Sequence, residues 1–489
     1  EKKMNKIRRE IGLPDVKIII STNEFGRSST LFLNKGFEEE DSSMLPPKPE
    51  KLMQLEESVN SLNSLPAYED DVIFKCGLIL ANSKRPWESI YAFDYNYSIN
   101  PDSDLGQRAF AESLFVLLDP LLEYQEILDR GNEYLKNYNQ GLTPRRTLYA
   151  MTLAHQRQTN WYNIKNLKPL IEDLENSDDK TILRYECELF FIQAIADMVL
   201  LNYFEARSGF DRVLVDYPGS HQQENASYWH AMSQVFLKNY SVALEELFEF
   251  ESNFPNSKWL PSVIFHQGVC YFGLEKYEDA KILFTKVISE YYESEVCSDA
   301  LSMRADLYAS EGMLDEAEID YYAAIENAVS IRQDTYAVFQ LASMLELEDK
   351  NDQILNLVDD YLKRNKKTAD VAKASFWIGK IKISQGLLDE AIEVYKNTIF
   401  DFGHDINQDG VDLIISELVR ASRKLTIEEK NELIKSLDSK IIQTNSHTLK
   451  LRLRVLGAEI NGNEIALGEE LIIELNDLNS APPPVLAII

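Results

Sequence analysis

Apolar residues recur at three- and four-residue spacing along most of the chain, which is the pattern of amphipathic helices. The pattern breaks at regular intervals, often beside a glycine, as in GLEKYEDAKILF (273–284), GMLDEAEIDYY (312–322) and GLLDEAIEVY (386–395). Each of these segments continues with an acidic residue, an alanine and a large side chain four residues after the alanine. The pattern predicts a repeated unit of helix, short turn and helix.

Three kinds of position recur every 37 residues through the middle of the chain. A small residue in the first helix and an alanine in the second let the two helices approach closely, and a large residue one turn later fills the space beyond. A fixed period between about 20 and 50 residues is typical of a solenoid. The small column is Ala194, Ala231, Gly268, Ala305, Ala342 and Gly379; the alanine column is Ala206, Ala243, Ala280, Ala317, Ile354 and Ala391; the large column is Phe210, Leu247, Phe284, Tyr321, Val358 and Tyr395.

The segments between units are YPGS (217–220), FPNS (254–257) and YYES (291–294). Proline or its substitute ends one helix, and the serine can cap the next. The order of small residue, turn, alanine, large residue and proline, as in GVCYFGLEKYEDAKILFTKVISEYY (268–292), resembles that of tetratricopeptide repeat proteins. Those repeats commonly have 34 residues. The longer linker here is similar to that of the subgroup containing outer-membrane assembly lipoproteins and the Tol–Pal coordinator.

We therefore expect an all-α, right-handed superhelical solenoid of antiparallel helix pairs, about eleven in number. The tail SAPPPVLAII (480–489) is typical of the opening turn of another first helix, so we expect the array to continue. The predicted regions are 1–66, an N-terminal extension and linker with a hairpin pattern at 16–34; 67–182, degenerate helical repeats; 183–403, regular repeats; and 404–489, degenerate repeats that continue beyond the chain end.

The net charge of the chain argues against two classes of binding partner. The chain has 80 acidic and 50 basic residues, a formal net charge of −30, which argues against nucleic acid and anionic membrane surfaces as partners. No run approaches the roughly 20 apolar residues of a membrane helix. The cysteines, which show no metal spacing, are predicted to be reduced thiols, with one disulfide in an exported protein as the alternative. They are Cys76, Cys187, Cys270 and Cys297.

Few residues have the spacing of a chemical site. DINQDG (405–410) resembles the first half of a calcium loop, which makes Asp405, Asn407 and Asp409 a weak calcium candidate. Ser416 occupies the position of the bidentate acid, so we favour a loop that caps the next helix. No HExxH, GxSxG, GxxxxGK[ST] or GxGxxG motif is present. We predict no cofactor, no other metal site and no catalysis.

The resemblance also implies where a partner binds, because in these arrays the first helices line the inner wall and two positions on each commonly touch ligand. The corresponding columns are Phe191, Tyr228, Phe265, Ser302, Phe339 and Phe376, and Ile195, Met232, Val269, Asp306, Ser343 and Lys380. The lysine and asparagine pairs that clamp a peptide C-terminal carboxylate in some family members are absent, which disfavours that ligand.

Two interpretations of these columns stay open. The aromatics pack between neighbouring first helices, or they form an apolar groove for a helix or extended segment of a partner. Residues 16–34 of the chain itself are a further candidate occupant. The groove hypothesis names Phe191, Ile195, Tyr228, Met232, Phe265, Val269, Phe339 and Phe376 as partner-binding residues.

The predicted function is a non-catalytic scaffold that binds other proteins or peptide segments, in a bacterial cell-envelope assembly in the periplasm. The alternative is a cytoplasmic adaptor or regulator, and a calcium-dependent or carbohydrate-processing enzyme is the third class. Neither nucleic acid nor a membrane span in this chain is expected, and the sequence leaves the oligomeric state open.

The alanine column supplies a direct test of the repeat registration. Ala280→Leu and Ala317→Leu should each overpack a helix pair and lower the free energy of unfolding by about 1–3 kcal/mol. Thermal melts of both variants check this. If both melt at the wild-type temperature, the registration is wrong.

Overall fold

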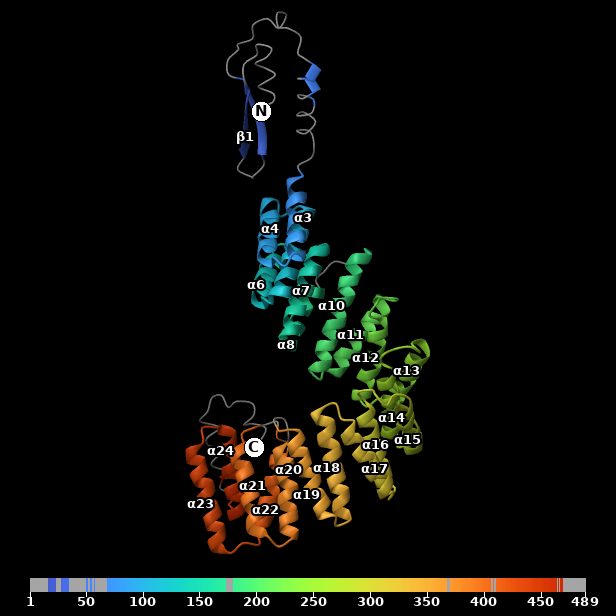
Figure 1. Ribbon diagram of the computed structural model, residues 1–489, viewed down its shortest axis with the longest axis vertical. Coiled ribbons are helices and arrows are strands. Elements are labelled where there is room, and N and C mark those ends of the chain that lie inside the picture. The colour runs from blue at the N-terminus through green and yellow to red at the C-terminus, as the bar shows by residue number, and fades with distance from the viewer. Residues whose placement is uncertain are drawn as a thin grey trace, which may run out of the picture. The chain divides into compact units, whose positions relative to one another are not determined.

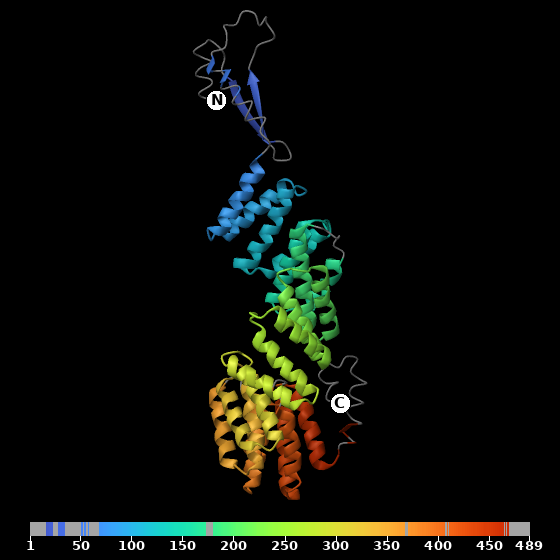
Figure 2. The same cartoon turned by 90° about the vertical axis from the view of Figure 1, so that its right-hand side faces the viewer.

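The computed structural model describes residues 16–22, 28–34, 50–51, 53–54, 57, 68–172, 179–366, 370–405, 408, 410–463, 465 and 467–468. The chain divides into two contact units, Glu1–Leu237 and Lys238–Ile489, and each is described by itself. Within each unit, successive helices run as antiparallel neighbours (Figures 1 and 2). The tail expected to open another first helix lies outside the described residues.

The first unit begins with two antiparallel strands within 16–34, paired so that Ile19 lies opposite Leu31. The strands are β1 (Val16–Thr22) and β2 (Ser28–Asn34). The other elements of this unit are α3 (Glu69–Asn82), α4 (Pro86–Ile99), α5 (Asp104–Val116), the π-type turn η2 (Leu117–Leu121), α6 (Tyr124–Leu135), α7 (Leu142–Arg157), α8 (Trp161–Asn166), α9 (Lys168–Glu172), α10 (Lys180–Val199), α11 (Tyr203–Asp216) and α12 (Gln223–Phe236).

In the second unit, every element that the structure describes is a helix. They are α13 (Tyr240–Asn253), α14 (Leu260–Gly273), α15 (Tyr277–Glu290), α16 (Cys297–Ser310), α17 (Leu314–Glu326), α18 (Ile331–Leu347), α19 (Asn351–Arg364), α20 (Val371–Ser384), α21 (Leu388–Phe402), α22 (Gly410–Ser422), α23 (Ile427–Gln443) and α24 (His447–Asn461). The prediction of an all-α helical solenoid is confirmed.

The three sequence columns form the buried seam of the helix pairs. In the pair α14–α15, Ala280 and Phe284 have no exposed surface, and a Cβ added to Gly268 would lie 2.6 Å from Cε1 of Phe284. In the pair α20–α21, a Cβ on Gly379 would lie 2.2 Å from Cε1 of Tyr395. The large ring of the second helix therefore occupies the space that a side chain on the first helix would need.

The same seam occurs in the first pair, α3–α4, where the sequence columns are hard to see. A Cβ on Gly77 would lie 2.6 Å from Cε1 of the fully buried Phe93. The Ser89 hydroxyl takes the place of the alanine and donates a hydrogen bond of 2.8 Å to the Gly77 carbonyl oxygen. Serine is tolerated at this buried position because its hydroxyl has an acceptor.

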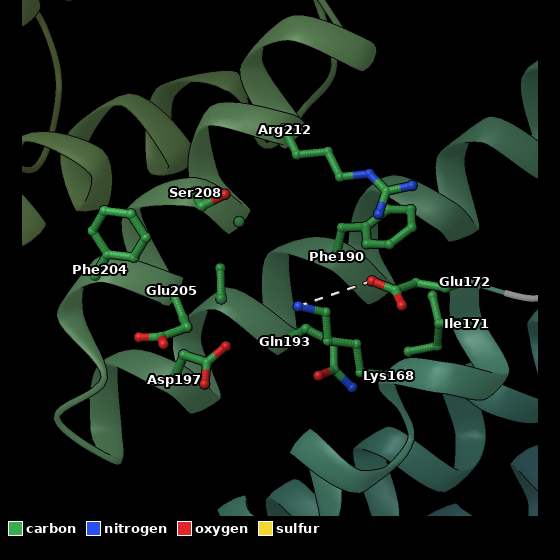
Figure 3. Close-up of a pocket in the computed structure, with 12 residues that line it drawn as sticks. Lys168, Ile171, Glu172, Phe190, Gln193, Asp197, Phe204, Glu205, Ser208 and Arg212 are labelled. Carbon is green, nitrogen blue, oxygen red and sulfur yellow. Dashed lines mark ion pairs between the residues drawn. The ribbon is translucent and has the colours of Figure 1, made fainter.

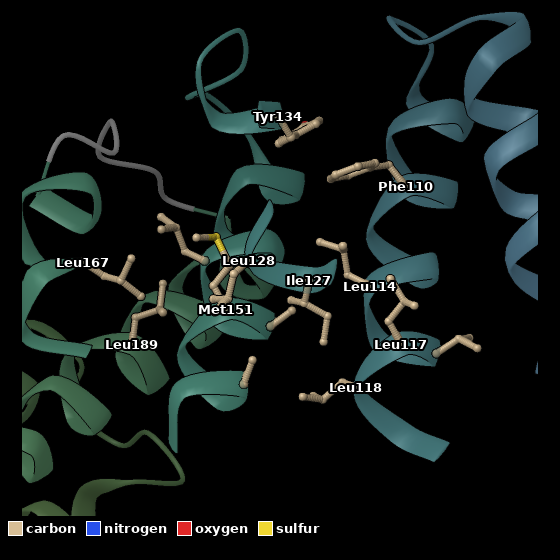
Figure 4. Close-up of a cluster of buried hydrophobic side chains, with 14 of the residues drawn as sticks. Phe110, Leu114, Leu117, Leu118, Ile127, Leu128, Tyr134, Met151, Leu167 and Leu189 are labelled. Carbon is tan, nitrogen blue, oxygen red and sulfur yellow. The ribbon is translucent and has the colours of Figure 1, made fainter. Parts of the chain in front are cut away.

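The core of the first unit combines apolar packing with one buried ion pair. Leucine, isoleucine and aromatic side chains from α5, α6, α7 and α10 meet in it, and the Phe110 ring stacks on Tyr134 with 4.4 Å between centroids (Figure 4). Beside it, Arg145 is 1% exposed and its Nε donates to Glu186 at 2.6 Å. The Tyr217 hydroxyl donates to the other oxygen of Glu186 at 3.3 Å. These bonds compensate the desolvation of both charges and link α7 to α10.

The turn after each first helix has its own 37-residue period. In each of these turns one residue has a positive φ. Helices commonly end with a residue in this left-handed conformation. Gly273, which the sequence pattern groups with Gly312 and Gly386, lies elsewhere: it ends α14, and a Cβ on it would lie 2.4 Å from Cε2 of Tyr240. The positive-φ residues are Leu201 (62°), Lys238 (61°), Glu275 (61°), Gly312 (80°), Asp349 (59°) and Gly386 (79°).

The turn geometry predicts opposite effects for one substitution at different glycines. Gly312→Ala and Gly386→Ala should each lower the free energy of unfolding by about 1–2 kcal/mol, because a Cβ is disfavoured in the left-handed region. Gly457→Ala is the matched control: this glycine lies within α24 with nothing within 4 Å of the added Cβ. It should raise the free energy by about 0.5–1 kcal/mol. Urea denaturation followed by circular dichroism measures all three, and equal shifts would contradict the turn assignment.

Candidate functional site

Three aromatics of the first predicted column, Phe191, Phe265 and Phe339, pack against the second helix of their own pair. Tyr228 on α12 and Phe265 on α14 are buried, with 4% and 9% exposed surface. The Phe265 ring lies 5.7 Å from that of Phe284 on α15. The half-buried aromatics behave alike: Phe191 lies 5.8 Å from the ring of Phe210, and Phe339 lies 5.2 Å from that of Tyr361. The half-buried Phe376 contacts the Trp377 ring at 5.4 Å.

These contacts give the aromatics a core role, and the cluster that contains Phe265 also includes Ala300 and Leu307 of the next first helix, α16. Binding of a partner by this column stays a prediction. In the same column, Ser302 is buried on α16. Truncation of a buried phenylalanine costs about 3–5 kcal/mol of folding free energy. Phe265→Ala would therefore destabilise the protein, and a loss of binding by this variant would not identify a contact with a partner.

The second column offers more accessible side chains. In the first unit, Ile195 on α10 is half-buried and Met232 on α12 is buried. In the second unit, four first helices each present one accessible side chain of different chemistry at the same register. These are the half-buried Val269 on α14, Asp306 on α16 and Lys380 on α20, and the exposed Ser343 on α18.

Asp306 is held by hydroxyl groups from two neighbouring helices. Tyr321 on α17 donates to one carboxylate oxygen at 2.5 Å, and Tyr336 on α18 donates to the other at 2.6 Å. Burial, and then the neighbouring carboxylate, raise the pKa of both tyrosines, so both hydroxyls remain donors at neutral pH. This arrangement fixes the position of a negative charge on the face of α16.

Lys380 is positioned in a comparable way on α20. Its Nζ lies 2.7 Å from Oε2 of Glu346 on α18 and 5.0 Å from the centroid of the Trp377 ring. The carboxylate and the aromatic face both attract the ammonium group and hold it in place. The second unit therefore carries a fixed acidic position and a fixed basic position two repeats apart.

The first unit contains a cavity of about 280 Å³ between α9, α10 and α11 (Figure 3). Phe204, Glu205 and Asp197 lie on one side of it, and Phe190, Ile171 and Glu172 lie on the other. Gly209 and Ala194 both belong to the lining and approach closely, since a Cβ added to Gly209 would lie 2.8 Å from Cβ of Ala194. The full lining is Lys168, Ile171, Glu172, Phe190, Gln193, Ala194, Asp197, Phe204, Glu205, Ser208, Gly209 and Arg212.

Both basic residues of the cavity have anionic partners. Lys168 Nζ lies 3.9 Å from Oε1 of Glu172. The Arg212 guanidinium lies 3.6 Å from the centroid of the Phe190 ring, and its Nε lies 3.3 Å from Oδ2 of Asp216. Sequence reasoning missed this site because α9 falls in the degenerate region and no motif joins its residues to those of α10 and α11.

The candidate chemical sites receive no support from geometry. Asp405 is described, whereas Asn407 and Asp409 lie outside the described residues. In the part of the chain that is described, no cluster of three histidine, cysteine or acidic side chains could hold a metal ion. All four cysteines are free thiols, and burial raises the pKa of Cys270 to about 12. Within the same described ranges, no helix is both long and apolar enough to cross a bilayer.

One protein-family model, the tetratricopeptide repeat, matches residues 262–294, which run from α14 to the end of the second helix and its linker. This segment is similar to a tetratricopeptide repeat, and the buried seam of the neighbouring pairs in the second unit recurs at the same 37-residue spacing. No curated protein matches the sequence significantly.

Several solved structures are similar in their helical repeats. A tetratricopeptide repeat protein from Parabacteroides merdae is 15% identical, with 55% of this chain and 97% of that chain covered and a TM-score of 0.34. Yeast Tom70 is 11% identical over 76% and 99%, with a TM-score of 0.34. The quorum sensor NprR from B. thuringiensis is 12% identical over 68% and 98%, with a TM-score of 0.45. These likenesses are too distant to carry partners or activities to this chain.

His155 on α7 gives a pH test of burial in the first unit. It is 7% exposed, its Nδ1 has no hydrogen-bond partner among the described residues, and burial lowers its pKa. The unfolded chain binds the proton more tightly, so stability should fall as the pH drops below about 6.5, by at most about 1.4 kcal/mol per pH unit from this residue. His155→Met should flatten this dependence in urea denaturation between pH 7.5 and 5.5.

His447→Met serves as the control, because His447 is exposed at the start of α24. It should keep the wild-type dependence on pH. Identical slopes for wild type and His155→Met would show that His155 is not buried in its neutral form.

Proposed function

We propose that the chain is a non-catalytic scaffold that binds other proteins or extended peptide segments along the first helices of its second unit. The observation that carries this proposal is the ordered series of accessible side chains at one register: Val269, Asp306, Ser343 and Lys380. Stacked helix pairs commonly use such extended surfaces to bind partners. The fixed carboxylate and the fixed ammonium would define the orientation of a bound segment.

A segment that suits this series carries complementary charges two repeat spacings apart, with a basic group for Asp306 and an acidic group for Lys380. Tyr321 and Tyr336 hold the carboxylate in place, and Glu346 holds the ammonium. Side chains that are already fixed lose less conformational entropy when a partner binds. The series therefore favours specific recognition of one segment over general adhesion.

The cellular setting belongs to the same proposal. The three-residue extension of the linker, similar to that of outer-membrane assembly lipoproteins and the Tol–Pal coordinator, supports a scaffold in the bacterial cell envelope. A cytoplasmic adaptor is the alternative. Fractionation of native cells, with detection of the chain by antibody, separates the two: recovery with the periplasm or outer membrane supports the first, and recovery with the cytoplasm supports the second.

The double variant Asp306→Asn with Lys380→Met tests the binding surface. Asparagine keeps an acceptor for one tyrosine and methionine keeps the apolar part of the lysine side chain, so folding should change little. Affinity for partners recovered from native cells should fall about tenfold, which corresponds to about 1.4 kcal/mol. Affinity capture followed by quantitative mass spectrometry measures the change.

Asp315→Asn with Lys424→Met is the matched control. It makes the same change of charge at two exposed positions outside the first-helix series. Capture by this variant should equal wild type. Equal capture by both double variants would place the binding surface elsewhere and end the proposal in this form.

A further inference from the structure

We propose that residues 49–62 form a helix that packs on an exposed apolar stripe of α3 and covers the outer side of the first helix pair. The stripe consists of Val72, Cys76 and Ile79. The proposal concerns the first unit alone and is independent of the binding series in the second unit. Three observations carry it: the register of the stripe, the burial of the same positions in the other first helices, and the sequence that directly precedes α3.

The seam fixes the register of α3 against the regular repeats. A Cβ on Gly77 would lie 2.6 Å from the Phe93 ring, and a Cβ on Gly268 would lie 2.6 Å from the Phe284 ring. Gly77 is therefore the small residue of α3, as Gly268 is the small residue of α14. Each residue of α3 can then be compared with the residues at the same distance from the small residue in the other first helices.

The stripe occupies positions that the regular first helices bury. Val72 stands five residues before the small residue and is 48% exposed, and Ile79 stands two residues after it and is 63% exposed. Cys76, between them, is exposed as well. At the two outer positions, no residue of the six regular first helices is more than 4% exposed. These residues are Leu189, Ala226, Val263, Ala300, Ala337 and Ala374, and Ala196, Ser233, Cys270, Leu307, Met344 and Ile381.

In the regular repeats this face of a first helix packs on the second helix of the preceding pair. Ala300 and Leu307 of α16 share a buried cluster with Phe284 and Val287 of α15. The covering helix is thus the one that comes directly before α16 in the chain. The stripe of α3 has the register and the apolar composition of an interface for such a preceding helix.

The free energy of an uncovered stripe favours a cover from the same chain. Full burial of a valine or isoleucine side chain contributes about 1.5–3 kcal/mol relative to leaving it exposed. The end units of repeat arrays normally have a polar outer face, and Val72 and Ile79 do not fit that rule. A segment tethered next to α3 has a high effective concentration there, so it binds without the help of a partner.

Residues 49–62, PEKLMQLEESVNSL, have the sequence of an amphipathic helix. Four apolar residues recur at the spacing i, i+3, i+7 and i+10, which predicts one apolar face. They are Leu52, Leu55, Val59 and Leu62. The structure describes residues 50, 51, 53, 54 and 57 of this segment, and all five are helical and exposed. With 3.6 residues per turn, Glu50, Gln54 and Glu57 lie on the side away from the predicted apolar face.

The segment also has the position of a preceding second helix. Counted from the small residue of the next first helix, 49–62 corresponds to α13, which spans Tyr240–Asn253, and 63–68 corresponds to the linker 254–259. Pro49 then takes the first helical position, where proline is tolerated. This alignment places the start of the helical array inside the region predicted as an N-terminal extension and linker.

The alignment matches two of the three core positions of α13. Leu52 and Val59 correspond to Ala243 and Phe250, which are buried. Glu56 is the departure, because it corresponds to a buried leucine of α13. The leucine directly before Glu56 lies on the predicted apolar face and can take that role.

Cys76 allows the cover to be measured in the full chain. It lies in the middle of the stripe, and the other three cysteines are buried. Alkylation with iodoacetamide, followed by peptide mass spectrometry, gives the rate at Cys76. The native chain should react at least about tenfold more slowly at Cys76 than the chain unfolded in urea. Leu55→Gln with Val59→Gln should raise the native rate about tenfold, because apolar contacts that hold the helix on α3 are lost.

Gln54→Glu with Glu57→Gln is the matched control, because it exchanges two exposed side chains away from the apolar face and keeps the net charge. Its rate should equal that of wild type, and circular dichroism checks that each variant is folded. A wild-type rate as fast as in urea would overturn the proposal and leave the stripe open to a helix of a partner protein.

Two further results would also contradict the proposal. Protection of Cys76 that increases with protein concentration would assign the stripe to a second copy of the chain. Protection that persists in Leu55→Gln with Val59→Gln would show that another segment covers α3. The scaffold proposal rests on Asp306 and Lys380, so none of these results decides it.

Discussion

The close approach of the two helices in each pair is the constraint on which the rest of the structure depends. A glycine or alanine on the first helix faces a large side chain of the second, and the two cannot both be large. At Gly268 the added Cβ would lie 2.6 Å from the fully buried Phe284, and at Gly379 it would lie 2.2 Å from the equally buried Tyr395. Interiors packed this tightly do not absorb an extra atom without a shift of the backbone or the ring.

This contact also fixes what each first helix presents outward. When the seam sets the distance and rotation of the pair, the position one residue after the small residue faces the accessible side in every repeat of the second unit. Asp306 and Lys380 occupy that position, and neighbouring helices then orient their charges through Tyr336 and Glu346. Packing energy thus determines the geometry of the proposed binding surface, while the residues at that surface remain free to vary from one repeat to the next.

The sequence predicts the seam because the core positions of repeated helices recur at a fixed spacing along the chain. The columns through Ala280 and Ala391 are buried as expected. It does not predict the left-handed turn at Glu275, because only Gly312 and Gly386 mark that position by residue type. The cavity around Gln193 escapes prediction for another reason. Its lining joins residues of three helices by tertiary contact, and only Ala194 among them belongs to one of the three repeating columns. The aromatic residue type at Phe265 is explained by core packing, because its ring lies 5.7 Å from that of Phe284.

The most direct test of the central constraint is a double-mutant cycle on Gly268 and Phe284, measured as free energies of unfolding in urea. Gly268→Ala should cost about 1–3 kcal/mol in the wild-type background. In the background of Phe284→Leu, which removes the opposing ring, the same change should cost at least about 1 kcal/mol less. Additive effects, within about 0.5 kcal/mol, would show that the two residues do not oppose each other and would contradict the account.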